Sequence, residues 1–136
     1  MINDIFRVFG EQTAEILFEI ITGCMDDYLY IFDLQNNTFE ISQSAVERFN
    51  MSKNVLTDAA NEVMKVVYEE DRRMLAKHLA DICEGREKVH NLHYRWLDKE
   101  GMPVWINCRG IVIVDQQGKA EYLVCLLYTS DAADEL

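Results

Sequence analysis

The side chains of this 136-residue chain that could do chemistry are four cysteines and three histidines. A thiolate can act as a nucleophile or bind a soft metal ion, and a neutral imidazole can act as a base or a metal ligand. These residues are Cys24, Cys83, Cys108, Cys125, His78, His90 and His93. They are widely spread, with no CxxC pair, no close Cys/His pair at metal-ligand spacing and no two histidines four residues apart. The spacing therefore predicts free thiols, buried or half-buried, and no metal site.

Motifs for catalysis are also missing from the sequence. It contains no GxSxG, no glycine-rich phosphate loop and no close arrangement of Ser, His and Asp or of Cys and His. We therefore expect this chain not to be an enzyme.

Charge and hydropathy narrow the class of protein further. The chain carries 24 acidic and 13 basic residues, for a formal net charge of -11, which opposes binding to nucleic acid or to an anionic membrane surface. No apolar run approaches the roughly 20 residues that a membrane span needs, and the N-terminus lacks the features of a signal peptide. We expect one cytoplasmic domain with no partner among nucleic acids and no insertion into a membrane.

Hydrophobic periodicity predicts the elements that position these residues. An amphipathic helix is expected over residues 3–22, and two strands, 25–34 and 38–42, should flank the turn "QNN". A short helix should follow Ser42 or Ser44, residues 52–68 are expected to form short helices, and residues 69–85 a regular helix ending near Gly85. Three strands, 89–98, 102–115 and 120–127, are separated by "KEG" and "QQG" turns. The fold class predicted is α+β: a five-stranded antiparallel sheet with helices packed on one face.

Four stretches of the chain resemble the PAS family in their order and spacing. They are "YIFDLQNNTFEIS" (30–42), "YEEDRRML" (68–75), "HYRWLDKEG" (93–101) and "VWINCRGIVIVDQQG" (104–118). Tyr68 and Glu69 stand where the family often has His-Pro, and Glu100 where Asp is usual, both at surface turn or cap positions. The resemblance gives a PAS domain over 25–124, preceded by the helix of residues 1–24.

The resemblance implies a function. PAS domains of this type occur in bacterial sensor proteins, often ahead of GGDEF, EAL or histidine kinase domains, so we expect a non-catalytic module that regulates a downstream output domain. The alternative is a ligand-free module for dimerisation or protein interaction. A pocket for an unknown small molecule could be lined by residues on the 69–85 helix and on alternating positions of the 102–115 strand, namely Leu75, His78, Leu79, Ile106, Cys108, Gly110 and Val112. Plain core is the more common role of such strand residues.

No cofactor is expected in that pocket. "INCRG" (106–110) shares Asn-Cys-Arg with flavin-binding relatives, but the motif there lies on a helix, whereas Cys108 is predicted within a strand. His78 lies on the helix that carries the axial ligand in haem-binding relatives, yet a helix with so charged a polar face more often places such a histidine at the boundary of that face. We expect neither flavin nor haem.

The predicted N-terminal helix carries more large apolar side chains than a solvent-facing helix needs. Phe6, Phe9, Leu17 and Ile21 should contact either the outer face of the sheet near Trp105 or a second copy of the chain, giving a homodimer. Trp96 and Trp105 are both expected on exposed apolar surface.

The end of the chain has an unusual sequence. "CLLYTSDAADE", within residues 125–136, resembles a translated sequencing adapter. The expectation is a native sequence that stops near Val124, a truncated fragment whose last strand is completed by a non-native tail.

Overall fold

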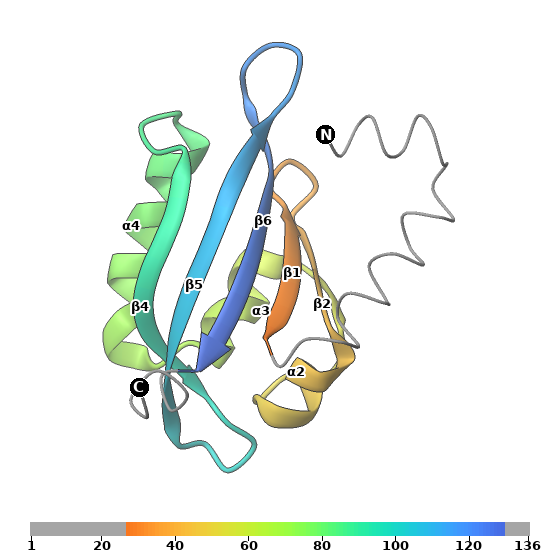
Figure 1. Cartoon of the computed structure of the whole chain (residues 1–136), viewed down its shortest axis with the longest axis vertical. Helices are drawn as coiled ribbons and strands as arrows, with labels where there is room; N and C mark the ends of the chain where they lie inside the picture. The colour runs from red at the N-terminus through yellow and green to blue at the C-terminus, as the bar shows by residue number, and fades with distance from the viewer. Residues whose placement is uncertain (1–26, 130–136) are drawn as a thin grey trace.

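The computed structural model describes residues 27–129, and a single antiparallel sheet runs through this part of the chain (Figure 1). The strand order is β3-β2-β1-β6-β5-β4, so the first hairpin lies beside the C-terminal meander in one sheet. The strands are β1 (Tyr28–Asp33), β2 (Thr38–Ile41), β3 (Val55–Thr57), β4 (Val89–Leu97), β5 (Pro103–Val114) and β6 (Ala120–Thr129). This is the α+β architecture, an antiparallel sheet with helices, that the sequence predicts.

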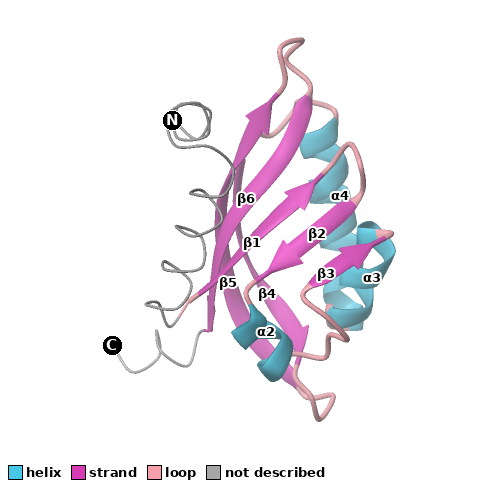
Figure 2. Cartoon of the chain, turned by 90° about the vertical axis from the view of Figure 1, so that its right-hand side faces the viewer, coloured by secondary structure: helices cyan, strands magenta, loops and turns pink. Residues whose placement is uncertain are grey.

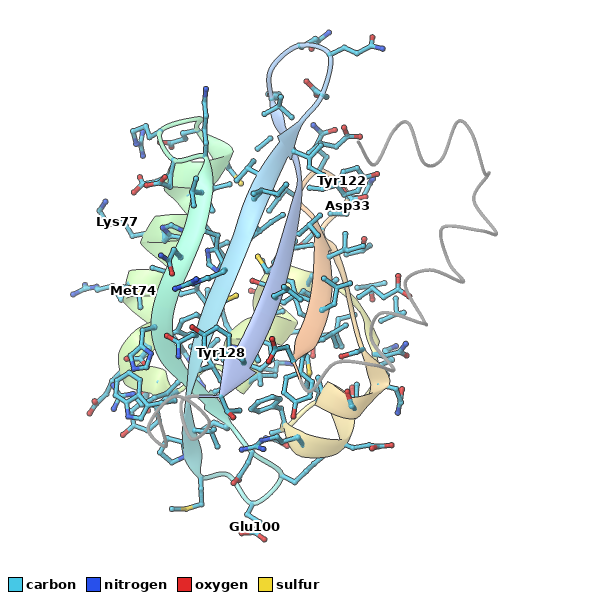
Figure 3. All side chains as sticks on the ribbon, viewed as in Figure 1. Asp33, Met74, Lys77, Glu100, Tyr122 and Tyr128 are labelled. Carbon is cyan, nitrogen blue, oxygen red and sulfur yellow. The ribbon has the colours of Figure 1, made fainter. Side chains whose placement is uncertain are left out.

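The helices lie on one face of this sheet, as Figure 2 shows. They are α2 (Gln43–Arg48), α3 (Ala59–Val66), the 3-10 turn η1 (Glu69–Asp71) and α4 (Arg72–Cys83). Apolar side chains of α4 face the sheet, with Leu75 and Ile82 buried, while Figure 3 shows Met74 and Lys77 pointing away from it. Among the described residues, no helix has the length and hydropathy needed to cross a membrane.

In three hairpins an aspartate side chain stabilises the turn. Each begins at an aspartate, Asp33, Asp98 or Asp115, whose carboxylate accepts hydrogen bonds from backbone N–H groups of the turn. Each turn also contains a residue with positive φ, which is Gly101 or Gly118 at 81° in the longer hairpins. The "QNN", "KEG" and "QQG" segments therefore form turns because the aspartate and the following residues satisfy the turn backbone locally.

The sheet has one strand more than the five predicted from the sequence. The short edge strand β3 pairs with β2 through residues 55–57, inside the segment for which only short helices were expected. Three residues are too few to show an alternating pattern, and α3 does occupy the second half of that segment.

The core fills the space between the sheet and the helices. Phe49 makes edge-to-face contacts with Tyr28 and Trp96, at ring-centroid distances of 5.5 and 5.1 Å. Trp96 is only 1% exposed, so the expectation that it lies on the surface is wrong. Trp105 pairs opposite Arg95 and lies on the outer face, 44% exposed. The two tryptophans face opposite sides because successive residues of a strand alternate between its faces, and the register of the β4/β5 hairpin pairs Trp105 with the neighbour of Trp96.

An ion pair fastens the start of α4 to β4. Asp71 accepts hydrogen bonds from the Arg95 backbone N–H at 2.9 Å and from its guanidinium Nε and Nη2 at 2.9 and 2.8 Å. The guanidinium also lies over the rings of Tyr68 and Trp105, at 4.4 and 4.5 Å from their centroids. The "YEEDRR" and "HYRW" motifs, 24 residues apart at Asp71 and Arg95, are thus two halves of one contact.

Two segments with sequence-based predictions lie outside the described residues. These are the helix expected over residues 1–24, with Phe6, Phe9, Leu17 and Ile21, and residues 130–136 of the tail. The first residues of the adapter-like stretch are described: Cys125–Thr129 belong to β6, where Leu127 is fully buried.

Candidate functional site

A small cavity lies between α4 and the inner face of the sheet. Its volume is about 10 Å³, roughly the space that one water molecule needs. Its walls combine apolar side chains with three aromatic polar ones and a histidine. They are Tyr30, Phe32, Phe39, Val63, Leu75, Leu79, His90, Tyr94, Trp96 and Leu123.

The pocket residues proposed from the sequence gather on both sides of this interior, without all reaching the cavity. Leu75 and Leu79 of α4 line it. The β5 residues Ile106 and Cys108 are fully buried on the inner face, and Val112 packs against the edge of the core. Whether any of them contacts a ligand stays a prediction.

His78 and Gly110 have particular surroundings. The ring of His78 lies 4.9 Å from that of His90 across the interface between α4 and β4. Burial, and then the nearby His90 ring, lower the pKa of His78, so this imidazole is neutral at pH 7. Gly110 pairs with His90 on one side and Cys125 on the other, and a Cβ placed on it would lie 2.1 Å from Cys125 Sγ. A side chain at position 110 would therefore fill the space that the Cys125 sulfur uses.

His90 is a site residue that the sequence analysis missed. It is 1% exposed on the inner face of β4, and neither ring nitrogen has a hydrogen-bond partner in the part of the chain that the structure describes. The sequence "VHNLHYRW" contains the signal, since His90 lies an even number of residues from the buried Tyr94 and Trp96 and therefore on the same face of the strand. Without knowing which parity faces inward, however, His90 and the exposed His93 could not be told apart.

Two thiols and a phenol surround His90. The Tyr30 hydroxyl lies 2.9 Å from Cys108 Sγ. The ring nitrogens of His90 and the sulfur atoms of Cys108 and Cys125 all lie within 4.8 Å of one another, and all three residues are buried. These side chains come from the adjacent strands β4, β5 and β6, with Tyr30 from β1.

The ionisable side chains of this cluster have pKa values that are shifted in different directions. Burial raises the pKa of the Cys108 thiol, but interactions with Cys125, His90 and Tyr30 outweigh burial and lower it to about 6. Burial and the neighbouring Cys108 sulfur raise the pKa of Cys125. Burial likewise raises the pKa of the Tyr30 and Tyr94 hydroxyls. Of Cys108, Cys125, Tyr30 and Tyr94, Cys108 is therefore the first to lose its proton as the pH rises. The neighbouring side chains stabilise the resulting thiolate.

The outer face of the sheet carries a second feature, an apolar row across four strands. Ile31, Val124, Ile111 and Val89 lie side by side in register on β1, β6, β5 and β4. Ile111 and Val89 are 57% and 56% exposed. Trp105 lies further along the same face, stacked on His93 with ring centroids 4.6 Å apart. The sheet therefore presents apolar surface on the side opposite the helices.

Comparisons with known proteins agree with this geometry. A family model described as the PAS fold matches residues 38–127. No curated protein matches the chain.

Among solved structures, the chain is similar to the N-terminal domain of a diguanylate cyclase with a PAS/PAC sensor from Marinobacter aquaeolei. The TM-score is 0.67 at 18% identity, covering 80% of this chain and 99% of that one. It is also similar to a sensory box histidine kinase/response regulator from Burkholderia thailandensis, with a TM-score of 0.64, 16% identity and coverage of 87% and 88%. A PAS domain of a Colwellia psychrerythraea protein gives a TM-score of 0.61 at 16% identity, covering 84% and 96%. Likeness at these identities shows a shared fold.

Proposed function

This chain belongs to the PAS-fold family, and from that premise we propose that it is a non-catalytic sensory module that regulates an output domain in the same polypeptide. The output domain would be an enzyme such as a diguanylate cyclase or a histidine kinase, the kinds of protein in which the similar structures occur.

The observation that carries the proposal is a group of buried polar atoms near the cavity that have no hydrogen-bond partner among the described residues. They are both ring nitrogens of His90, Nε2 of His78 and Nε1 of Trp96. Each such atom costs about 1–3 kcal/mol when left unpaired, and most buried polar groups in native proteins are paired. A bound group that paired with them would recover this free energy. The interior of the domain is therefore suited to respond to a ligand.

The ion pair at the start of α4 offers a route from this interior to the surface. Asp71 precedes α4, the helix that covers the cavity, and holds Arg95, whose guanidinium lies against Trp105 on the outer face. A shift of α4 relative to β4 would move Arg95 and change the packing of Trp105. A ligand that acts on the cavity can in this way alter the outer surface of the sheet.

The burial of the Cys108 thiol supports a role without catalysis. Cys108, whose pKa is lowered to about 6, is completely buried beneath the helices. A nucleophile in that position cannot meet a substrate from solution.

The apolar row of Ile31, Val124, Ile111 and Val89 favours a second candidate function, a ligand-free module for dimerisation or protein interaction. The small volume of the cavity, about 10 Å³, also fits a core filled by its own side chains. In this reading the outer face pairs two chains and the interior only stabilises the fold.

A chimaera distinguishes the two candidates. The chain is fused in place of the sensor of a histidine kinase, and the rate of autophosphorylation is measured. His90→Leu removes the unpartnered nitrogens, Ile111→Glu disrupts the apolar row, and Met74→Ala, on the solvent side of α4, is the matched control (Figure 3). The sensory proposal expects His90→Leu to change the rate about fivefold or more while Met74→Ala leaves it unchanged. A rate sensitive to Ile111→Glu alone would support the pairing module, and a rate insensitive to all three would exclude both.

A further inference from the structure

One row of residues across the inner face of the sheet has a gap at its centre. His90, Gly110 and Cys125 stand directly opposite one another on β4, β5 and β6. Because Gly110 has no side chain, the Cys125 sulfur occupies the space over it. Cys108 lies two residues away on the same face of β5. The result is a triangle of one imidazole and two thiols whose ligating atoms all lie within 4.8 Å of one another.

The imidazole in this triangle is available to bind something. His90 is 1% exposed, and within residues 27–129 neither of its nitrogens has a hydrogen-bond partner. A nitrogen without a partner at that depth is uncommon in native proteins and is an open coordination position if an ion is supplied.

The triangle has nearly the dimensions of a metal site. In any triangle with sides no longer than 4.8 Å, some point lies within about 2.8 Å of all three corners. Zinc binds sulfur at about 2.3 Å and imidazole nitrogen at about 2.0 Å, so the three groups would have to close by less than about 1 Å. We propose that His90, Cys108 and Cys125 form a binding site for a divalent thiophilic metal ion, with Zn²⁺ as its first candidate.

The charge balance selects a divalent ion. Two thiolates and a neutral imidazole carry a charge of −2, so a divalent cation makes the buried assembly neutral, whereas Cu⁺ would leave a net negative charge without water around it. Binding releases to solvent any proton that the two thiols still carry. The Tyr30 hydroxyl, 2.9 Å from Cys108 Sγ, can donate a hydrogen bond to the bound thiolate. With three protein ligands the ion keeps an open fourth position.

The sequence predicts no metal site because successive ligands are 18 and 17 residues apart along the chain and match no ligand spacing. Cys125 is also the first residue of the adapter-like stretch, so the site is a property of this sequence with cysteine at position 125. A metal ion at this site would be the ligand of the sensory interior, so this proposal rests on the proposed function. Binding is measured on the isolated chain and signalling in the kinase chimaera, so either one can fail without the other.

The test uses the full chain with its other two thiols removed by Cys24→Ser and Cys83→Ser. Reduced protein is titrated with Co²⁺ as a spectroscopic probe, and Zn²⁺ is then added in competition. We expect one ion per chain, a thiolate-to-cobalt charge-transfer band with intense visible bands of a tetrahedral site, and displacement of Co²⁺ by Zn²⁺. At a hundredfold excess of Zn²⁺ over its Kd, the Tm should rise by roughly ten degrees.

Three single variants locate the ligands. Cys108→Ser, Cys125→Ser and His90→Gln should each weaken Zn²⁺ binding more than about 100-fold, since even the outer-shell partners of a metal site are worth 10–100-fold. Circular dichroism without metal shows whether each variant is folded. X-ray absorption of the Zn²⁺-loaded protein needs no variant, and it should show two sulfur neighbours and at least one nitrogen. A spectrum with only nitrogen and oxygen neighbours, no thiolate band with Co²⁺, or equal affinity in folded variants would overturn the proposal.

Discussion

Gly110→Ala is the substitution whose effect follows most directly from the structure. A Cβ at this position would lie 2.1 Å from Cys125 Sγ, 2.4 Å from the Val124 carbonyl oxygen and 3.0 Å from Cys125 Cα. Two of these three atoms belong to the backbone of β6, so rotation of the Cys125 side chain cannot relieve the contact. β5 and β6 would have to separate in the middle of the stretch over which they pair.

The cost of such overpacking in a core is about 1–3 kcal/mol. For a domain of about 100 residues, this corresponds to a fall in Tm of roughly 5–15 °C. The assay is thermal unfolding followed by circular dichroism, with urea unfolding to give the free energy of unfolding. Arg109→Ala is the matched control, because Arg109 is the exposed neighbour on the outer face of the same strand.

A second variant separates the side-chain contact from the backbone contacts. Adding Cys125→Ala to Gly110→Ala removes the sulfur but leaves the Val124 carbonyl oxygen in place, so the double variant should stay less stable than Cys125→Ala alone. A Tm of Gly110→Ala equal to that of Arg109→Ala would refute the reasoning. It would mean that β5 and β6 do not approach as closely as the structure shows.

Three further predictions concern charge, surface and cofactors. Hydrogen bonds from Arg95 lower the pKa of the Asp71 carboxyl, so the pair stabilises the fold above about pH 4 and loses this contribution as the pH falls below that value. In urea unfolding, Asp71→Asn should therefore be less stable than the unchanged protein at neutral pH, and this difference should shrink in acid. A difference that stays constant with pH would contradict the linkage. Ile111→Glu, or deletion of residues 1–22, should change the mass measured by light scattering, through loss of dimer or through aggregation, while the control Met74→Glu should not. Unchanged mass and stability in both Ile111→Glu and the deletion variant would count against a pairing role for the outer face. Protein expressed with haem and flavin precursors should show no absorbance beyond its aromatic band, and a bound Soret or flavin spectrum would show that a cofactor does enter.

The local elements of this fold could be predicted because their causes are local. The three hairpins follow from an aspartate that satisfies the turn backbone and from a residue with positive φ, all within five or six positions. Helix α4 follows from its own apolar spacing and from Gly85 just beyond its end, with φ of 79°. The short strand β3 was missed because its three residues carry no periodic signal of their own.

Five of the six strands, the hairpin turns and the alternation of side chains along each strand could be predicted from the sequence, since they depend on residues that are close along the chain. Which of the two alternating sets faces the helices depends on the tertiary structure. That choice places Trp96 and His90 in the core and Trp105 and His93 on the outer face. It also decided which distant residues meet: Asp71 with Arg95, and His90 with Cys108 and Cys125. Strand register fixes these contacts, and register depends on the packing of the whole sheet against its helices, which no short stretch of sequence contains.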